Sequence, residues 1–378
     1  MTKIFLSPPH MGGTENQYIQ QAFEQNWIAP LGENVDMFET AILDYTAGEH
    51  ALALSSGTAA IHLALLTMGI GTGDSVFCST LTFAASANPI TYVNATPVFI
   101  DSDEETWNMS PEALRLALED AKTTNNLPKA VIIVHILGLA AKLDKLVAIC
   151  KEYGVPIIED AAESLGSTYH GKMTGTFGEM GIFSFNGNKI MTTSGGGMLL
   201  TNSNEDREKA FYYATQAKEQ APYYLHLEIG YNYRLSNILA GIGRGQMEVL
   251  ADHVDKRRAI FDRYSDTLAD LEGVSMMPIL PDTAPNCWLS AIRLDYSIIS
   301  KSTKEIVAYM QERDIEARMM WNPLHKQPSF SESRCYQVGE ENISEKLFEE
   351  VLCLPSGSSM TEAEQARVLE ALVEILTA

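Results

Sequence analysis

One lysine stands in a loop whose composition is unusual for a lysine. Residues 184–197 read SFNGNKIMTTSGGG, and Lys189 is the only charged residue in this stretch. Lysines mostly lie on solvated faces near acids, whereas this one lies in a Gly-rich, uncharged segment between two apolar runs. Burial lowers the pKa of an amine and makes it nucleophilic towards carbonyl carbons. The lack of an acid in the loop therefore predicts an amine left free to react, because a tight ion pair would quench it.

A carboxylate ends the apolar run PIIED (156–160), which is typical of a short buried strand. Burying an acid is costly unless it has a partner. Asp160 is therefore expected beside a cation or a strong hydrogen-bond donor. A helix cap or an ordinary salt bridge is the alternative interpretation.

Two further features follow strand-like runs. ALALS (51–55) leads into Gly57 and Thr58, which open an apolar helical pattern over 58–70. A helix N-terminus of this kind can bind a phosphate, although ordinary capping by a hydroxyl would look the same. SVFC (75–78) leads to Phe83, whose ring either stacks on a planar ligand or fills the core.

Together these groups match the needs of one cofactor. Ligands of open α/β sheets bind at the carboxyl ends of the strands, where all four features are expected. Pyridoxal 5'-phosphate (PLP) has a phosphate, a planar ring, a ring nitrogen that needs an acid and an aldehyde that needs an amine. The combination of features predicts that Lys189 is covalently modified by PLP.

The surrounding elements predict an α/β fold. Strand-like runs alternate with helical patterns, which favours a mostly parallel sheet with helices on both faces. After about residue 235 a long helical stretch precedes a smaller α+β unit, whose last helix starts at Thr361 with a capping box. We expect a large domain over 1–250 and a small C-terminal domain over 251–378. The other expected strands are 97–101, 130–135, 287–296 and 315–320, and the other expected helices are 110–122, 142–154, 235–272 and 302–314.

Two glycine clusters do not form a dinucleotide fingerprint. GIGTGD (69–74) lacks the third glycine and precedes a strand, so it is interpreted as a turn after a helix. GIGRG (241–245) falls inside a helical pattern, which indicates close packing of helices, within the chain or between subunits.

The composition narrows the class of protein. The formal net charge of -22 argues against nucleic-acid binding. No long apolar run or signal peptide is found, so no membrane association is expected. The five scattered cysteines predict reduced thiols in a cytoplasmic protein, and no spacing suggests a metal site.

The order of the motifs resembles one known family. SGT, TF, EDAAE, SFNGNK, TTSGGG, GYNYRLSN and PLH occur as in the DegT/DnrJ/EryC1/StrS sugar aminotransferases, over essentially the whole chain. The resemblance implies a fold-type I PLP transferase. It also implies a large mostly parallel-sheet α/β domain, a small C-terminal α+β domain, and a homodimer with a shared active site.

The resemblance gives each matching residue a role. Lys189 would hold the cofactor and then move the proton of the reaction, and Asp160 would pair with the pyridine nitrogen. Glu163 stands where many relatives have Gln or His against the ring hydroxyl, and its protonation state is left open. The other implied cofactor contacts are the ring-stacking Phe83, the phosphate ligands Gly57, Thr58 and Ser184, and Asn232 donated by the partner subunit.

Substrate contacts are implied for a second set of residues. These lie in motifs that are near the sugar nucleotide in relatives: Trp27, Asn188, Arg234, Arg318 and His325. Each has an ordinary alternative, such as a surface arginine, a histidine satisfied by backbone, or a tryptophan at a dimer contact.

Several segments, among them EDAAE, SFNGNKI and YNYRLSN, most resemble the bacillosamine-type subgroup. This implies amino transfer from L-glutamate to UDP-2-acetamido-2,6-dideoxy-4-ketohexose, yielding UDP-4-amino-4,6-dideoxy-N-acetylglucosamine and 2-oxoglutarate. The alternatives are another keto sugar nucleotide, of the GDP-perosamine or dTDP-amino-sugar type, and a PLP-binding regulator without catalysis. A related dehydratase is disfavoured because it would carry His in place of Lys189. A Rossmann-type enzyme is disfavoured because the fingerprint is missing.

Overall fold

The computed structural model of the chain describes residues 2–377. Its central element is an eight-stranded sheet in which β9 is antiparallel to both neighbours and all other adjacent strands are parallel. This confirms the predicted α/β class with a mostly parallel sheet. In spatial order the strands are β1 (His50–Leu54), β9 (Gly197–Thr201), β8 (Met180–Ser184), β5 (Ile157–Asp160), β4 (Ala130–Val134), β2 (Ser75–Ser79), β3 (Thr96–Ile100) and β14 (Cys335–Tyr336).

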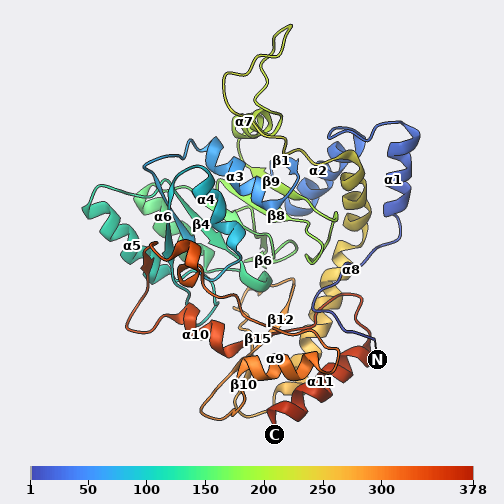
Figure 1. The fold of residues 1–378 in the computed structure, drawn as a ribbon, viewed down its shortest axis with the longest axis vertical. Helices are drawn as coiled ribbons and strands as arrows, with labels where there is room; N and C mark the ends of the chain where they lie inside the picture. Colours follow the sequence, from blue (N-terminus) through green and yellow to red (C-terminus); the bar gives the residue numbers. More distant parts are fainter. Residues whose placement is uncertain (1, 378) are drawn as a thin grey trace.

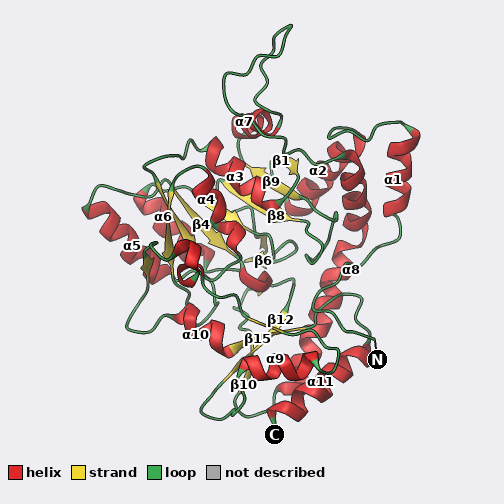
Figure 2. Ribbon diagram, viewed as in Figure 1, coloured by secondary structure: helices red, strands yellow, loops and turns green. Residues whose placement is uncertain are grey.

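Helices cover both faces of this sheet (Figures 1 and 2). Alternate strand residues enter different cores: Ile132 packs with α3 and α4, whereas Val131 and Ile133 pack with α5 and α6. None of the helices described is both long and apolar enough to cross a membrane. The helices of this part are α1 (Glu15–Glu24), α2 (Glu33–Thr46), α3 (Gly57–Thr67), α4 (Asn88–Tyr92), α5 (Pro111–Thr123), α6 (Leu143–Tyr153) and α7 (Asn204–Ala214), with the 3₁₀ turns η1 (Ala84–Ser86) and η2 (Ile136–Gly138).

The C-terminal part is a smaller α+β unit, as predicted. An antiparallel sheet in the order β10 (Val274–Met276), β12 (Ser290–Leu294), β15 (Val351–Leu354) and β13 (Arg318–Met319) packs against helices. The capping box of the last helix is present at Thr361 and Glu364. The remaining elements are the sheet β11 (Thr283–Ala284), β6 (Thr168–Tyr169) and β7 (Lys172–Met173), the helices α9 (Thr303–Gln311), α10 (Ile343–Glu350) and α11 (Glu362–Leu376), and the 3₁₀ turns η3 (Leu324–Lys326) and η4 (Pro328–Phe330).

Two predicted strands are shorter than expected. The strand expected over 287–296 begins only at Ser290, and the one expected over 315–320 is reduced to Arg318 and Met319. Ile315 instead forms an isolated bridge with Ile4, so the N-terminal segment takes up hydrogen bonds that a longer strand would have used.

The long helix α8 (Asn237–Leu268) connects the two parts (Figure 1). Residue 250, where the domain boundary is predicted, lies inside this continuous helix. Ile4 packs in the core of the C-terminal part, although it is distant in sequence. The N-terminal segment and α8 therefore tie the two parts together, and the division at 250 stays a prediction.

The GIGRG stretch lies on α8, where α1 and α2 pack closely against it. A Cβ at Gly243 would stand 2.8 Å from the ring of Phe38, and one at Gly245 would stand 2.8 Å from the backbone of Glu15. This confirms close helix packing, and it occurs within the chain. GIGTGD forms the turn after α3, where Gly69 adopts a positive φ of 70°.

Candidate active site

All predicted cofactor residues except Asn232 meet at the carboxyl ends of the central strands. β5 ends at Asp160, β8 ends at Ser184, and β1 ends just before Ser55. Since β1, β8 and β5 run in one direction, these ends share one edge of the sheet, where ligands of α/β folds bind. A cleft of about 950 Å³ opens there, which is within the usual range for ligand pockets.

Most of the predicted residues line this cleft. They are Gly57, Thr58, Phe83, Asp160, Glu163, Ser184, Asn188, Lys189 and Arg318. The Phe83 side chain is 61% exposed, so the alternative of a buried core residue is wrong. Its ring is available to a ligand in the cleft.

Asp160 is buried at the end of β5 without a cationic partner in the described chain. Ser86 donates its hydroxyl to Oδ2 at 2.6 Å, and the amide of Ala162 donates to Oδ1 at 3.2 Å. Neither bond neutralises the carboxylate, since a hydroxyl and an amide bring no full charge. A buried carboxylate of this kind is suited to a positively charged or protonated group inside the cleft.

Lys189 does have an acidic neighbour, although its loop contains none. Its Nζ lies 3.3 Å from Oε1 of Glu163, which enters from the segment after β5. The expectation that no acid lies near this amine is therefore wrong, because an acid from another segment reaches it. Burial raises the pKa of Glu163, while the Lys189 charge and the hydrogen bond from the Leu137 amide oppose that rise.

The lysine amine also lies against a tryptophan that the sequence did not indicate as a site residue. Nζ of Lys189 lies 4.1 Å from the ring centroid of Trp288, a cation–π distance. The indole Nε1 of Trp288 donates to the carbonyl of Asn188 at 2.7 Å, and the hydroxyl of Ser7 donates to the same carbonyl at 2.7 Å. The residue before Lys189 is thus fixed from two directions.

The start of α3 forms a cradle of backbone atoms. Ser56 caps the helix by accepting from the amide of Ala59, and the amides of Gly57 and Thr58 lie in the first turn, where no helical partner exists. A Cβ at Gly57 would stand 3.2 Å from Cβ of Ser184. The cradle combines free amides with a nearby hydroxyl, which is the donor set that a phosphate prefers.

Three predicted substrate residues lie outside the cleft lining. Arg234 bonds to Glu39 at 2.9 Å and to the carbonyl of Ala53 at 3.0 Å. His325 bonds through its two ring nitrogens to the side chains of Thr80 and Glu345, at 2.7 Å and 3.0 Å. These bonds give Arg234 and His325 ordinary structural roles in the single chain. Trp27 is half-exposed and likewise stands away from the cleft.

Asn232 lies outside the cleft of its own chain. It is exposed, and its side chain accepts only a hydrogen bond from Gln216 at 3.2 Å. The segment 215–232 extends from the body beyond α7 (Figure 1). The placement suits a residue donated to another subunit, and that role stays a prediction.

Comparison with known proteins identifies the family. The model of the DegT/DnrJ/EryC1/StrS aminotransferase family matches residues 9–373. The chain belongs to this family. It is a PLP-dependent sugar aminotransferase.

The aminotransferase is similar to named relatives along its whole length. It is 54% identical over 374 residues to "Putative pyridoxal phosphate-dependent aminotransferase EpsN" of Bacillus subtilis (strain 168), covering 99% of this chain and 96% of that protein. It is 34% identical to the GDP-perosamine synthase of Caulobacter vibrioides, covering 100% and 99% of the two chains. The crystal structure of a DegT DnrJ EryC1 StrS aminotransferase from Brucella abortus superposes with a TM-score of 0.89 at 30% identity, covering 97% and 96%.

The residues of the aminotransferase fit PLP. The α3 cradle would hold the phosphate, and its spacing is tight, because a Cβ at Gly57 would stand 3.2 Å from Cβ of Ser184. Asp160 would meet the ring nitrogen, Phe83 would face the ring, and Lys189 would reach the aldehyde. The four groups predicted from the sequence therefore stand in one cleft.

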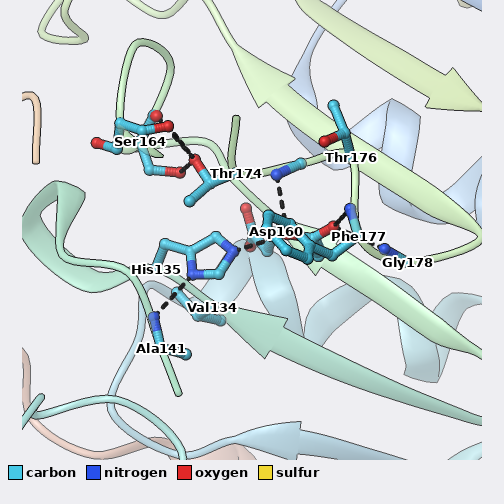
Figure 3. A network of polar contacts seen from close by, with 12 residues as sticks. Val134, His135, Ala141, Asp160, Ser164, Thr174, Thr176, Phe177 and Gly178 are labelled. Atoms are coloured by element: carbon cyan, nitrogen blue, oxygen red, sulfur yellow. Dashed lines mark hydrogen bonds and ion pairs between the residues drawn. The ribbon is translucent and has the colours of Figure 1, made fainter. Parts of the chain in front are cut away.

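A buried network below the cleft holds the strand end that carries Asp160 (Figure 3). The amide of Ala141 donates to Nδ1 of His135 at 3.2 Å, so Nε2 carries the proton and donates to Glu159 at 3.0 Å. His135 is therefore neutral, and Glu159 is the charged member of the pair. Glu159 also accepts backbone amides of the following loop, those of Gly175, Phe177 and Gly178.

Proposed function

We propose that this aminotransferase transfers the amino group of L-glutamate to the C4'' ketone of UDP-2-acetamido-2,6-dideoxy-4-ketohexose. The products are UDP-4-amino-4,6-dideoxy-N-acetylglucosamine, for bacillosamine-type glycans, and 2-oxoglutarate. The observation that carries the reaction type is the meeting of Lys189, Asp160 and Glu163 in one cleft. The segments that resemble bacillosamine-type enzymes support the choice of sugar. The five unpaired cysteines support a cytoplasmic setting.

Each side chain of the cleft is proposed to have a separate role in the reaction. Bound PLP supplies an electron sink for the bond changes at the substrate carbon. Asp160 keeps a proton on the ring nitrogen, because its own oxygens receive only the neutral donors Ser86 and Ala162. The amine of Lys189 removes and returns the proton at the substrate carbon, a task worth typically about 10²–10⁴-fold in rate.

Glu163 helps to set the protonation of this amine. It lies 3.3 Å from Nζ of Lys189 and is held on its other oxygen by the Leu137 amide at 2.8 Å. Its raised pKa favours the protonated acid more than in an ordinary glutamate. Glu163 is therefore placed to exchange a proton with Lys189 or with the ring hydroxyl of the cofactor.

We further propose that Arg318 is a substrate contact. It is the cation of the cleft lining besides Lys189, and its side chain is mostly exposed while bonding to Glu316 at 2.7 Å. An exposed guanidinium at the rim is suited to a diphosphate. Asn188 lines the same cleft and is proposed to contact the sugar.

The active enzyme is proposed to be a homodimer that shares its sites. The extended segment 215–232 carries apolar side chains that are almost fully exposed in the single chain, including Tyr224, Leu227 and Ile229. Exposed apolar clusters of this kind mark interaction surfaces. Asn232 lies on the same segment, so docking on a second copy would carry it to the partner's phosphate cradle.

Complementation tests the shared site. Lys189→Ala and Asn232→Ala are each expected to be inactive as homodimers. Their mixture, after subunit exchange, should regain activity, because one site of each mixed dimer contains both native residues. The double variant mixed with wild-type protein is the control. Lack of recovery in mixed dimers of confirmed composition would contradict the role of Asn232.

The reaction is tested by absorbance and by mass. Purified protein loaded with PLP should absorb in the visible region, lose that band with L-glutamate, and regain it with the UDP-4-keto sugar. After borohydride reduction, the cofactor mass should be found on the peptide with Lys189. Lys189→Ala should lose this adduct, whereas the exposed control Lys145→Ala should retain it. A wild-type protein without any adduct would refute the assignment of Lys189.

A GDP-linked 4-keto-6-deoxy sugar is the second candidate. It is favoured by the 34% identity to a GDP-perosamine synthase over the whole chain. The ratio of kcat/KM for UDP-linked and GDP-linked substrates, measured with glutamate saturating, decides between them. A preference for the GDP sugar would overturn the UDP proposal and leave the chemistry of the cleft unchanged.

A further inference from the structure

A buried arginine behind the cleft has no acidic partner among the residues that the structure describes. Arg257 on α8 is 1% exposed, and burial lowers the pKa of its guanidinium to about 9, so it stays charged at neutral pH. Its hydrogen bonds go to the carbonyl of Trp288 and to the hydroxyl of Ser7, the latter at 3.0 Å. Its Nε has no partner among the residues that the structure describes. Burying a charged group that has only neutral partners is costly. The cost indicates that Arg257 has a role beyond filling the core.

Both partners of Arg257 bond to one atom. Ser7 donates its hydroxyl to the carbonyl oxygen of Asn188 at 2.7 Å, and Trp288 donates its indole N–H to the same oxygen at 2.7 Å. The four residues form a closed ring of hydrogen bonds from four distant segments. Asn188 immediately precedes Lys189, so the ring fixes the backbone that carries the reactive lysine.

The guanidinium also determines the direction of the serine proton. A hydroxyl has one hydrogen to donate and lone pairs to accept with. Because Arg257 donates to the Ser7 oxygen, the single proton of Ser7 is left for Asn188. An arginine is suited to this task, since its planar fork reaches two acceptors in fixed geometry and a lysine does not.

The same ring of hydrogen bonds positions the indole of Trp288, which the lysine amine contacts. Arg257 holds the backbone of Trp288, and the indole face lies 4.1 Å from Nζ of Lys189. Oε1 of Glu163 lies 3.3 Å from the same Nζ. A shift of Trp288 would therefore move one wall of the site in which the amine stands.

We propose that Arg257 is a positioning residue for Lys189, acting through Ser7 and Trp288 on the Asn188 carbonyl and on the indole face. The catalytic consequence rests on the proposed role of Lys189 as the cofactor-bearing lysine. Arg258, the next residue on α8, offers a matched control. It also donates to backbone carbonyls, those of Pro285 and Ala284, but it makes no bond to the ring around Asn188.

The test measures the amine of Lys189 directly, without the cofactor. Cofactor-free protein is treated with an amine-acylating reagent over a range of pH, and modification of the Lys189 peptide is followed by mass spectrometry. Arg257→Lys and Ser7→Ala are expected to change the rate or its pH midpoint by about tenfold or more, since misplacement by about 1 Å can cost about 10²-fold. Arg258→Lys should match the wild type, and Ser7→Thr should recover part of the Ser7→Ala effect.

Kinetic and thermal unfolding measurements distinguish a positioning role of Arg257 from a role in stability alone. With PLP bound, Arg257→Lys and Ser7→Ala should lower kcat while KM for the sugar nucleotide changes little. If both variants only melt at lower temperature, and Lys189 reacts as in the wild type, the proposal is overturned and Arg257 is a core residue. Should Arg257→Lys not fold, the Ser7→Ala and Ser7→Thr pair decides the matter. If reagent accessibility changes but wild-type protein shows no cofactor adduct, the role of Lys189 fails while the positioning stands.

Discussion

Replacing Gly197 is predicted to weaken cofactor binding, because this residue lies where β9 packs against the start of α3. In the sheet it stands between Leu54 of β1 and Ser184 of β8. A Cβ at this position would be 2.4 Å from the carbonyl carbon of Ser56 and 2.5 Å from the amide nitrogen of Gly57. Carbon atoms in contact rest at about 3.5–4.0 Å, so Gly197→Ala requires a displacement of about 1 Å.

The displacement should fall on the phosphate cradle. β9 is hydrogen-bonded on both sides along its length, whereas the start of α3 borders the open cleft. Overpacking of this kind costs about 1–3 kcal/mol. If the shift moves the amides of Gly57 and Thr58, the same energy corresponds to a loss of roughly 5- to 150-fold in PLP affinity.

PLP titration followed by absorbance measures this loss, and thermal unfolding of the cofactor-free chain shows how much strain remains in the fold. Gly187→Ala is the matched control, because a Cβ there meets no atom within 4 Å. The control should bind PLP as the wild type does. Wild-type affinity in Gly197→Ala would refute both the close approach and the assignment of the cradle.

Three further predictions concern charged groups. Asp160→Asn keeps the shape of the side chain but removes its charge, so kcat should fall by about 10²–10³-fold while thermal unfolding changes little; an unchanged kcat would exclude pairing with the ring nitrogen. Arg234→Ala leaves the buried Glu39 without its main partner, so the free energy of unfolding should fall by about 3–5 kcal/mol. KM for the sugar nucleotide should not change, and a raised KM would show that Arg234 contacts the substrate after all. Burial, together with nearby cations, lowers the pKa of His253 to about 4, below the ordinary value of 6.5. The unfolded chain therefore binds more protons than the folded chain between these values, and the free energy of unfolding should fall as the pH is lowered from 6.5 to 4. Denaturant unfolding across this range should show a smaller fall for His253→Gln, while the exposed control His170→Gln should behave as the wild type.

The parts of the site that have a local signal were predictable from the sequence. Asp160 ends an apolar strand that the sequence predicts, and a strand end fixes which edge of the sheet a side chain occupies. Ser184 also ends a strand, β8, but that strand was not expected, and the residue was implied only by the family resemblance. The glycine and hydroxyl residues that open α3 have a recognisable capping pattern. For Asp160 and the start of α3, the element alone places the residue in the cleft.

The remaining parts depend on contacts between distant segments. The bond from Trp288 to Asn188 spans 100 residues, and that from Ser7 spans 181. No periodicity or motif marks such partners, so Trp288 was predicted only as part of a strand. Lys189 shows the same limit: its loop is free of acids, yet Glu163 reaches it because two strand ends converge. Arg234 likewise lies in a motif implied to bind substrate, but it bonds to Glu39 from α2.

The charge of the cleft lining bears on the proposed dimer. Its lining contains three carboxylates, Asp160, Glu163 and Glu316, and two cationic side chains, Lys189 and Arg318. A cofactor phosphate and a sugar-linked diphosphate would add further negative charge. Because the whole chain carries a net charge of -22, long-range attraction cannot compensate, so local donors must do so. The amides of the α3 cradle would supply part of this for the cofactor, and within the described cleft lining Arg318 is the cation besides Lys189 that a diphosphate could contact. The segment 215–232, which is proposed to reach a second copy, contains Lys218, His226 and Asn232 but also Glu219 and Glu228, so what it would bring is individual donors such as the Asn232 amide and no net positive charge.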